Sequence, residues 1–242
     1  MRVSTTTLQN SFGKYLQMAS EGQEIIVTKN GTGIAQLKPY KEFKNFSVHE
    51  VGGDYIYNHR VTYEKFLKLS EISESQYELI DGQIYLMSAP RHIHQAMVTR
   101  LTVKIANWLD GQPCEAFVAP YDIKLYNDSP SFEEDPNVVQ PDISVICDPD
   151  NINDNGYYEG IPTMVVEVLS PSTRSKDMIA KLSLYMKSGI AEYWLVDTDQ
   201  QEIMMYSFKD RNAPCVHTFR LGETLASGHF KGLEISLNDI FK

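Results

Sequence analysis

Two acidic residues stand in strongly apolar surroundings in the second half of the 242-residue chain. Asp142 opens the apolar run 143–146, and Glu167 lies inside the run Met164–Leu169, a composition typical of a buried strand. Carboxylates from two neighbouring strands can converge on one divalent cation, which prefers oxygen ligands. The alternative is that Glu167 is a core carboxylate neutralised by a buried partner.

Other catalytic motifs are absent or weak. The stretch Ser170–Arg174 contains serines but not the G-x-S-x-G pattern of a nucleophile elbow. A turn and helix cap, whose amides and Arg174 could hold a phosphate, explains it better. The sequence contains neither G-x-x-x-x-G-K-[ST] nor G-x-G-x-x-G, so nothing supports a nucleotide cofactor.

The elements that must position these residues follow from hydrophobic periodicity and turn residues. Helices are predicted from Thr62, from His92 to Asp110, and from Ser172 to Ser188, where Gly189 ends the last. Asp81-Gly82 predicts a hairpin within 77–87. Further strands are predicted at 115–119, 121–126, 142–147, 163–169, 192–197 and 202–208. This order predicts an α+β fold in which one mixed sheet is flanked by helices.

Residues 1–40 predict a separate β-α-β-β unit. Hydroxyl side chains at 4–7 precede a helix whose apolar face contains Leu8, Phe12, Tyr15, Leu16 and Ala19. Asn30-Gly31 then separates two strand-like runs, a strong hairpin signal. Because so small a unit buries its helix poorly, we expect two copies to pair as a homodimer. The alternative is that the unit folds back onto the rest of its own chain as a structural cover. Residues 41–60 are expected to form a linker.

Composition narrows the class of protein. With 42% hydrophobic and 22% charged residues, the chain can bury a core, which excludes disordered and collagen-like proteins. No apolar stretch reaches the roughly 20 residues of a membrane span, and the first residues lack the apolar core of a secretory signal. The three cysteines form no C-x-x-C pair. These features predict a cytoplasmic protein with reduced cysteines, no thiolate metal site and no membrane partner.

Charge is unevenly distributed along the chain. Residues 1–41 carry five basic and two acidic residues, a net charge of +3, so the remainder of a chain of net charge −10 carries −13. This asymmetry predicts two modules with different partners. An acidic module can still act on DNA when carboxylates hold a divalent metal, because the cation reverses the local field.

Several strings that occur in order resemble the Uma-two family, a bacterial set of restriction-endonuclease-like proteins. They are YELIDG (77–82), SAP (88–90) with His94-Gln95, QPDISVICDPD (140–150), VVEVLSPSTRSKD (165–177) and AEYWLVD (191–197). The resemblance covers about residues 61–242. It implies the PD-(D/E)XK nuclease fold, a mixed sheet core with helices on both sides.

The resemblance also implies a catalytic set. Asp142 matches the Asp of the PD half and Glu167 the acid of the second half, which together would hold Mg²⁺ or Mn²⁺. The nuclease pattern has a lysine two residues after that acid, where this chain has Leu169. The family supplies a lysine from the following helix instead, and Lys181 fits, with Asp177 one turn earlier. An ordinary surface pair between those two residues is the alternative, and Lys124 is the other candidate lysine.

Two more residues match family positions. Glu78 could be a third metal ligand or hold a water, or it could be a half-exposed hairpin acid. His94 could contact phosphate, orient a carboxylate, or serve only as a hydrogen-bonded structural residue.

Residues 1–40 resemble the DNA-binding half of Phd-type (prevent-host-death) antitoxins. The matching segments are Val3-Ser4, FGKYL (12–16), EIIVTKNG (24–31) and IAQL (34–37). The resemblance implies DNA binding, with Lys14 and Lys29 on the binding surface. The whole chain is therefore predicted to be a metal-dependent endonuclease acting on DNA. The alternative is a non-catalytic DNA-binding or regulatory protein that keeps the nuclease scaffold, distinguished by the lack of a basic group facing the two carboxylates.

Overall fold

The computed structural model describes residues 1–37, 48–51, 54–57, 60–127, 129–154, 156–210 and 213–242. The chain divides into two compact units, Met1–Phe46 and Ser47–Lys242, and each is described by itself. In the described ranges, no helix combines the length and apolar character needed to cross a membrane.

The first unit has the predicted β-α-β-β order. Strand β2 (Ile25–Lys29) lies between β1 (Arg2–Ser4), which is parallel to it, and β3 (Thr32–Leu37), which is antiparallel. The helical segment consists of α1 (Thr5–Asn10) and α2 (Phe12–Ser20), which are separated at Ser11. Ser4 caps α1 by accepting a hydrogen bond from the Thr7 amide at 3.1 Å. Asn30 and Gly31 both adopt the positive φ that the tight hairpin turn requires.

Only part of the predicted apolar helix face is buried in this unit. Tyr15 and Ala19 pack with Val3 and Ile25, whereas Phe12 and Leu16 are 52% and 50% exposed. The small sheet therefore leaves an apolar surface on α2 uncovered.

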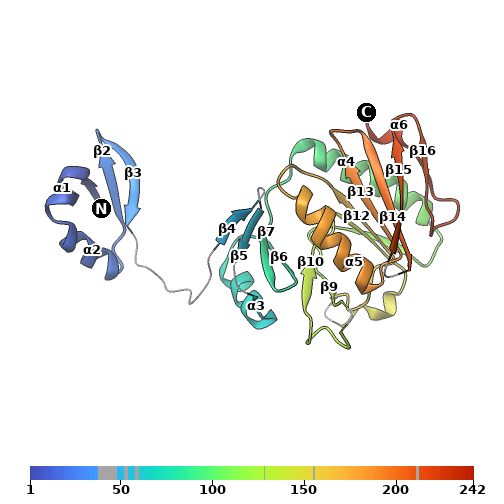
Figure 1. The fold of residues 1–242 in the computed structure, drawn as a ribbon, viewed down its shortest axis with the longest axis horizontal. Helices are drawn as coiled ribbons and strands as arrows, with labels where there is room; N and C mark the ends of the chain where they lie inside the picture. Colours follow the sequence, from blue (N-terminus) through green and yellow to red (C-terminus); the bar gives the residue numbers. More distant parts are fainter. Residues whose placement is uncertain (38–47, 52–53, 58–59, 128, 155, 211–212) are drawn as a thin grey trace. The chain divides into compact units, whose positions relative to one another are not determined.

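The second unit contains two six-stranded sheets (Figure 1). The mixed sheet has the order β15 (Ala213–Arg220), β14 (Glu202–Asp210), β13 (Glu192–Asp197), β12 (Met164–Val168), β11 (Ile143–Ile146) and β8 (Glu115–Val118). The antiparallel sheet has the order β4 (Val48–Val51), β5 (Asp54–Tyr57), β7 (Gln83–Leu86), β6 (Tyr77–Ile80), β10 (Asn137–Val139) and β9 (Ile123–Leu125). Strands β16 (Thr224–Ala226) and β17 (Glu234–Ser236) form a separate pair. The predicted mixed sheet is confirmed, and the antiparallel sheet is additional.

Helices cover both faces of the mixed sheet, as predicted for an α+β fold. Alternate residues of β12, among them Val166, pack in one core with α4 (His92–Leu109), and Val165 packs in a second core with α5 (Leu182–Ser188). Glu167 follows the same alternation and faces α5. The remaining helices are α3 (Tyr63–Ile72), capped by Thr62 as predicted, and the short α6 (Leu237–Ile240).

Two expectations need correction. Part of the range 41–60, expected to be a linker, forms β4 and β5, which pair with each other and extend the antiparallel sheet through β7. Its β-branched and aromatic residues favour strands, a signal that the mixed polarity of the segment obscured. Residues 38–47 of that region lie outside the described ranges.

The cysteines also differ from the expected reduced state. Cys114 and Cys147 form a disulfide, while Cys215 is free and exposed. Strands β8 and β11 pair with Glu115 opposite Ile146, so the next residues outward, the two cysteines, are brought together. Their separation of 33 residues in the sequence gave no indication of this pairing.

Candidate active site

Asp142 and Glu167 occupy facing positions on adjacent antiparallel strands. In the pairing of β11 with β12, Ile143 lies opposite Val166. One step further along this register places Asp142 opposite Glu167, on the same face of the sheet. The Val168 amide donates a hydrogen bond to Asp142 Oδ2 at 2.7 Å, which fixes the aspartate against β12. The strands thus bring together two acids that lie far apart in the sequence.

Lys181 lies directly beside Glu167. Its Nζ is 2.7 Å from Glu167 Oε1, and the Tyr185 hydroxyl donates a hydrogen bond to the same oxygen at 2.8 Å. All three side chains are buried. The lysine therefore does not belong to an ordinary surface pair.

A π-helical turn, Lys176–Lys181, produces this placement. The α-helical period of the predicted helix from Ser172 to Ser188 places Ile179 in a buried stripe with Met178, Leu182, Tyr185 and Met186. The structure instead exposes 68% of Ile179 and buries Lys176, Asp177 and Lys181. A π-helix has more residues per turn than the α-helical period assumed, so a different set of side chains faces the sheet. Because the prediction rested on the α-helical period, it missed Lys176.

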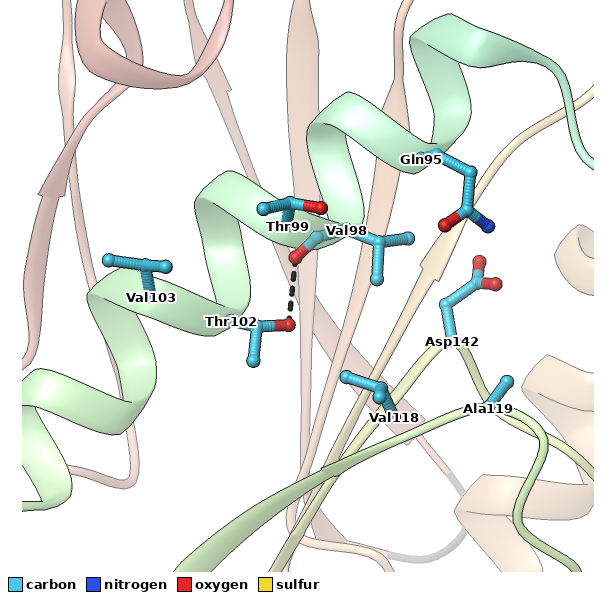
Figure 2. Close-up of a pocket in the computed structure, with 8 residues that line it drawn as sticks. All are labelled: Gln95, Val98, Thr99, Thr102, Val103, Val118, Ala119 and Asp142. Carbon is cyan, nitrogen blue, oxygen red and sulfur yellow. Dashed lines mark hydrogen bonds between the residues drawn. The ribbon is translucent and has the colours of Figure 1, made fainter.

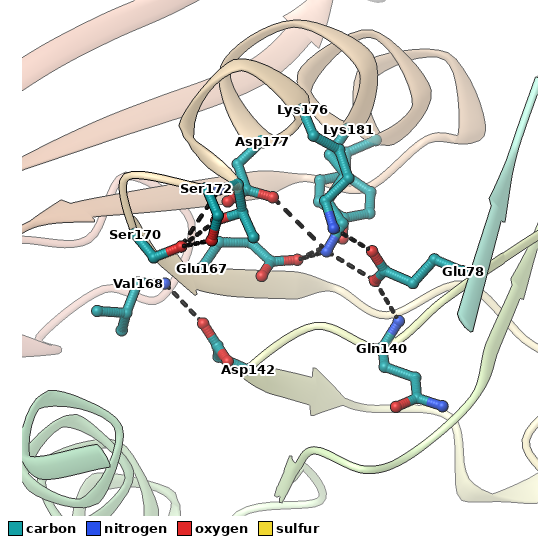
Figure 3. A network of polar contacts seen from close by, with 12 residues as sticks. Glu78, Gln140, Asp142, Glu167, Val168, Ser170, Ser172, Lys176, Asp177 and Lys181 are labelled. Carbon is teal, nitrogen blue, oxygen red and sulfur yellow. Dashed lines mark hydrogen bonds and ion pairs between the residues drawn. The ribbon is translucent and has the colours of Figure 1, made fainter. Parts of the chain in front are cut away.

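Glu78 connects two lysines behind the carboxylate pair. Glu78 Oε2 lies 2.8 Å from Lys176 Nζ, and Glu78 Oε1 lies 2.8 Å from Lys181 Nζ. Glu78 Oε1 also accepts a hydrogen bond from the backbone N–H of Gln140 at 2.8 Å. The side chain is fully buried, so the alternative of a half-exposed hairpin acid is wrong. Figure 3 shows Glu78 reaching Lys181 from the side opposite Glu167.

His94 and Asp177 complete the surroundings. His94 Nε2 lies 3.1 Å from Asp142 Oδ2, so this histidine contacts a carboxylate. Asp177 Oδ1 lies 3.8 Å from Lys181 Nζ. Three buried polar atoms in the described structure accept or donate no hydrogen bond: His94 Nδ1, Gln140 Oε1 and Asp177 Oδ1. All three belong to residues that line one cleft.

Burial and pairing shift the protonation of these groups in different directions. Burial raises the pKa of Glu167 to about 8, because Lys181 only partly offsets the loss of water and three nearby acids add to it. Burial acts on Glu78 in the same sense, but Lys176 and Lys181 outweigh it and lower the pKa of Glu78 to about 2. Burial works against charge on Lys181 as well, yet Glu167 and Glu78 raise its pKa well above the ordinary value. Lys181 is therefore a permanent cation near neutral pH.

The cleft has a volume of about 770 Å³ and is lined by Asp142, Glu167 and Lys181 together with His94, Lys176 and Asp177. Its lining also includes the loop 88–91 that precedes α4 and the turn 168–173 that follows β12. In Figure 3 the Glu167 oxygen that does not contact Lys181 is turned toward Asp142. A solvent-accessible space therefore reaches both carboxylates.

Four predicted residues lie elsewhere. The Lys124 ammonium lies over the rings of Tyr63 and Phe132, at 5.9 and 5.7 Å from their centroids, and is not among the residues lining the cleft. Arg174 is paired with Asp197 at 2.7 Å, also away from the cleft lining. Lys14 and Lys29 belong to the first unit, where both are exposed.

The donor set suits a small hard cation. Among the described residues no group of three or more His, Cys, Asp or Glu side chains could hold a metal, so a closed protein cage is absent there. Asp142 and Glu167 offer two carboxylates at the cleft wall. Magnesium is characteristically bound in this way, through one or two carboxylates, with waters and substrate phosphate oxygens completing its shell.

Comparison with known proteins agrees with this fold. Residues 63–238 match the family model described as "Uma2: Putative restriction endonuclease", and the chain belongs to this family. The uncharacterized protein slr1290 of Synechocystis sp. is 34% identical over 148 residues, which cover 61% of this chain and 74% of that protein. The crystal structure of a "putative nuclease belonging to DUF820" from Anabaena variabilis has a TM-score of 0.60 at 22% identity, covering 75% of this chain and 97% of that one. At 22% identity, this structural similarity shows that the two chains share a fold.

Proposed function

We propose that the protein is a metal-dependent endonuclease that hydrolyses phosphodiester bonds of DNA. The observation that carries this proposal is the convergence of Asp142, Glu167 and Lys181 on one cleft, with the lysine 2.7 Å from Glu167. Family membership supports a nuclease; the metal, the DNA substrate and the residue roles are our proposal.

Asp142 and Glu167 would hold Mg²⁺ or Mn²⁺. When bound, such a cation supplies charge stabilisation for a phosphate and lowers the pKa of a coordinated water. The Val168 amide and His94 both contact Asp142 Oδ2, so they fix the direction in which this carboxylate presents its other oxygen. Tyr185 and Lys181 do the same for Glu167.

Lys181 acts through its charge in this proposal. Because its pKa is raised, it keeps its proton and can stabilise negative charge that develops on the phosphate. It can also orient an attacking water by donating a hydrogen bond. A role as proton acceptor would require it to lose a proton that Glu78 and Glu167 both stabilise.

The position of Lys181 beside Glu167 supports the enzyme over an inactive scaffold, because the scaffold alternative lacks a basic group facing the two carboxylates. We regard DNA binding without cleavage as the alternative outcome of the test below.

The first unit would contribute dimerisation and DNA contacts. The half-exposed Phe12 and Leu16 lie one helical turn apart on α2, where a second copy can cover them. Lys14 and Lys29 are exposed, in keeping with the resemblance to Phd-type antitoxins. This gives a homodimer with a cationic surface suited to the DNA backbone.

Two lysine variants test the proposed roles. Lys181→Met should lower the rate of Mg²⁺-dependent DNA cleavage by roughly 10²–10⁴-fold, as expected for loss of an electrostatic stabiliser. Lys124→Met is the matched control, because this lysine packs over Tyr63 and Phe132, and it should cleave like the wild type. Loss of activity in the Lys124 variant alone would contradict the assignment.

A further inference from the structure

A second, smaller groove opens beside the catalytic cleft, between α4 and β8 (Figure 2). Its volume is about 260 Å³. The side chains that α4 contributes follow helical spacing, so they form one continuous wall along the helix. They are Gln95, Val98, Thr99, Thr102 and Val103, and the opposite wall consists of Val118 and Ala119.

The lining of this groove is nearly uncharged. Asp142, at one end, is its one ionisable residue. Val103 and Val118 are 51% and 45% exposed, so apolar surface faces the opening. The Thr102 hydroxyl already donates to the Val98 carbonyl at 2.8 Å. The Gln95 amide and the Thr99 hydroxyl remain as hydrogen-bonding groups at its surface. Such a lining offers little to a phosphate and suits an uncharged, partly apolar group with a hydrogen-bonding edge.

The groove and the cleft are continuous. Gln95, Ala119 and Asp142 line both, and Figure 2 shows the Gln95 amide directed toward Asp142. A nucleic acid whose scissile phosphate lies at Asp142 and Glu167 would therefore bring the adjacent nucleotide to the mouth of the groove. This continuity identifies the occupant as part of the same substrate.

We propose that the α4–β8 groove binds the base of the nucleotide next to the scissile phosphate, and that the substrate is consequently unpaired DNA. This inference rests on the nuclease function proposed above. In a duplex the base is stacked and paired, so it can enter a groove only where the strand is single or the base is flipped out. Gln95 and Thr99 then contact the edge of the base.

The charges around the cleft favour the same substrate. Its lining contains three basic residues, Arg91, Lys176 and Lys181, against five acidic residues, Glu74, Asp142, Glu167, Asp177 and Asp199. Lys176 and Lys181 are moreover both paired with the buried Glu78 carboxylate. This lining offers few contacts to backbone phosphates of either form, whereas a groove that holds a base by its edge and by apolar contacts adds affinity only for a strand whose base is free to enter it.

Filling the groove tests this inference on the full chain. A fluorescein-labelled unpaired 20-mer and the same strand in a duplex serve as probes, and binding is measured by anisotropy with Ca²⁺ in place of Mg²⁺. Thr99→Phe places a ring in the groove and should weaken binding of the unpaired strand by roughly tenfold or more. Gln95→Ala, which removes the amide without adding bulk, should weaken it less. Ala106→Phe is the matched control, since Ala106 is exposed on α4 outside the groove, and should bind like the wild type.

Two results would overturn the inference: wild-type binding that favours the duplex, or Thr99→Phe binding of the unpaired strand within about twofold of the wild type. Parallel cleavage assays with Mg²⁺ separate the two proposals. Loss of binding in Thr99→Phe without cleavage by the wild type would support the groove and refute the nuclease. Equal cleavage of the unpaired strand by both proteins would support the nuclease and refute the groove.

Discussion

Glu78 and Lys181 form a buried ion pair, with the lysine ammonium 2.8 Å from a carboxylate oxygen of Glu78. The glutamate comes from strand β6 of the antiparallel sheet, and the lysine from the π-helical turn that covers the mixed sheet. The pair therefore joins the two sheets at the cleft. It also fixes the ammonium beside Glu167, which Lys181 contacts at the same time.

Glu78→Gln should destabilise the protein strongly. The substitution leaves Lys176 and Lys181 in the interior without the carboxylate that pairs with both, and breaking a buried pair typically costs about 3–5 kcal/mol. Urea unfolding measures the change in the free energy of unfolding. Glu64→Gln is the control, because it removes an equally short but exposed pair with Lys68 and should leave stability unchanged. Similar effects of the two substitutions would contradict the structure.

Glu78 should also govern stability in acid. Its pKa is lowered from 4.5 to about 2, so the folded state holds this carboxylate charged where the unfolded state takes up a proton. The stabilisation is present above pH 4.5 and is lost as the pH falls toward 2. The free energy of unfolding, measured across this window, should fall less steeply in Glu78→Gln than in the wild type. If the free energy of unfolding fell equally steeply with pH in both proteins, Glu78 would not be the source of the loss of stability in acid.

Glu167 should show the opposite sign. Because its pKa is raised to about 8, the folded state without metal keeps a proton that the unfolded state releases near pH 4.5. Stability contributed by this group therefore falls as the pH rises from 4.5 to 8. A divalent cation must displace the same proton, so Mn²⁺ should bind more tightly at pH 8 than at pH 6.5, with proton release at the lower pH. Calorimetry in buffers of different ionisation enthalpy measures both quantities, and affinity that does not change with pH would argue against Glu167 as a ligand.

The uncovered face of α2 should control the oligomeric state. Phe12→Asp places a charge where we propose that a second copy packs, so the full chain should become a monomer in sedimentation or light scattering. Ile72→Asp alters a similarly exposed apolar residue of the second unit and should remain dimeric. A wild-type chain that is already a monomer would refute dimerisation through this face.

Local signals predicted much of the fold. Hairpins at Asn30-Gly31 and Asp81-Gly82, the helix cap at Thr62 and the strands that carry Asp142 and Glu167 all depend on neighbouring residues, and the structure confirms them. Strands β10, β15, β16 and β17 were missed. The two-sheet arrangement was missed as well, because it depends on pairing between distant segments that periodicity does not encode.

The candidate site shows the same limit. Resemblance to a family indicated Lys181, but the α-helical period placed Ile179 in the buried stripe, whereas the π-helical turn exposes it and buries Lys176. Lys176 was therefore missed, and so was the burial of Glu78. The buried acids and lysines of the site stabilise one another as ion pairs. No single position in the sequence therefore indicates that the network exists. In the sequence, the signal that pointed to Lys176 was a lysine nine residues after Glu167, outside the spacing of the nuclease pattern.

A single-turnover cleavage assay tests the central claim most directly, with wild type and Asp142→Asn compared on the same labelled unpaired DNA in Mg²⁺ and in EDTA. Asp142→Asn keeps the size of the side chain and removes the charge that would help hold the cation. We expect the wild type to cleave only with Mg²⁺, and the variant to cleave at a rate lower by roughly 10²-fold or more. Wild-type protein that cleaves equally in EDTA, or a variant that cleaves as fast as the wild type, would contradict the central claim.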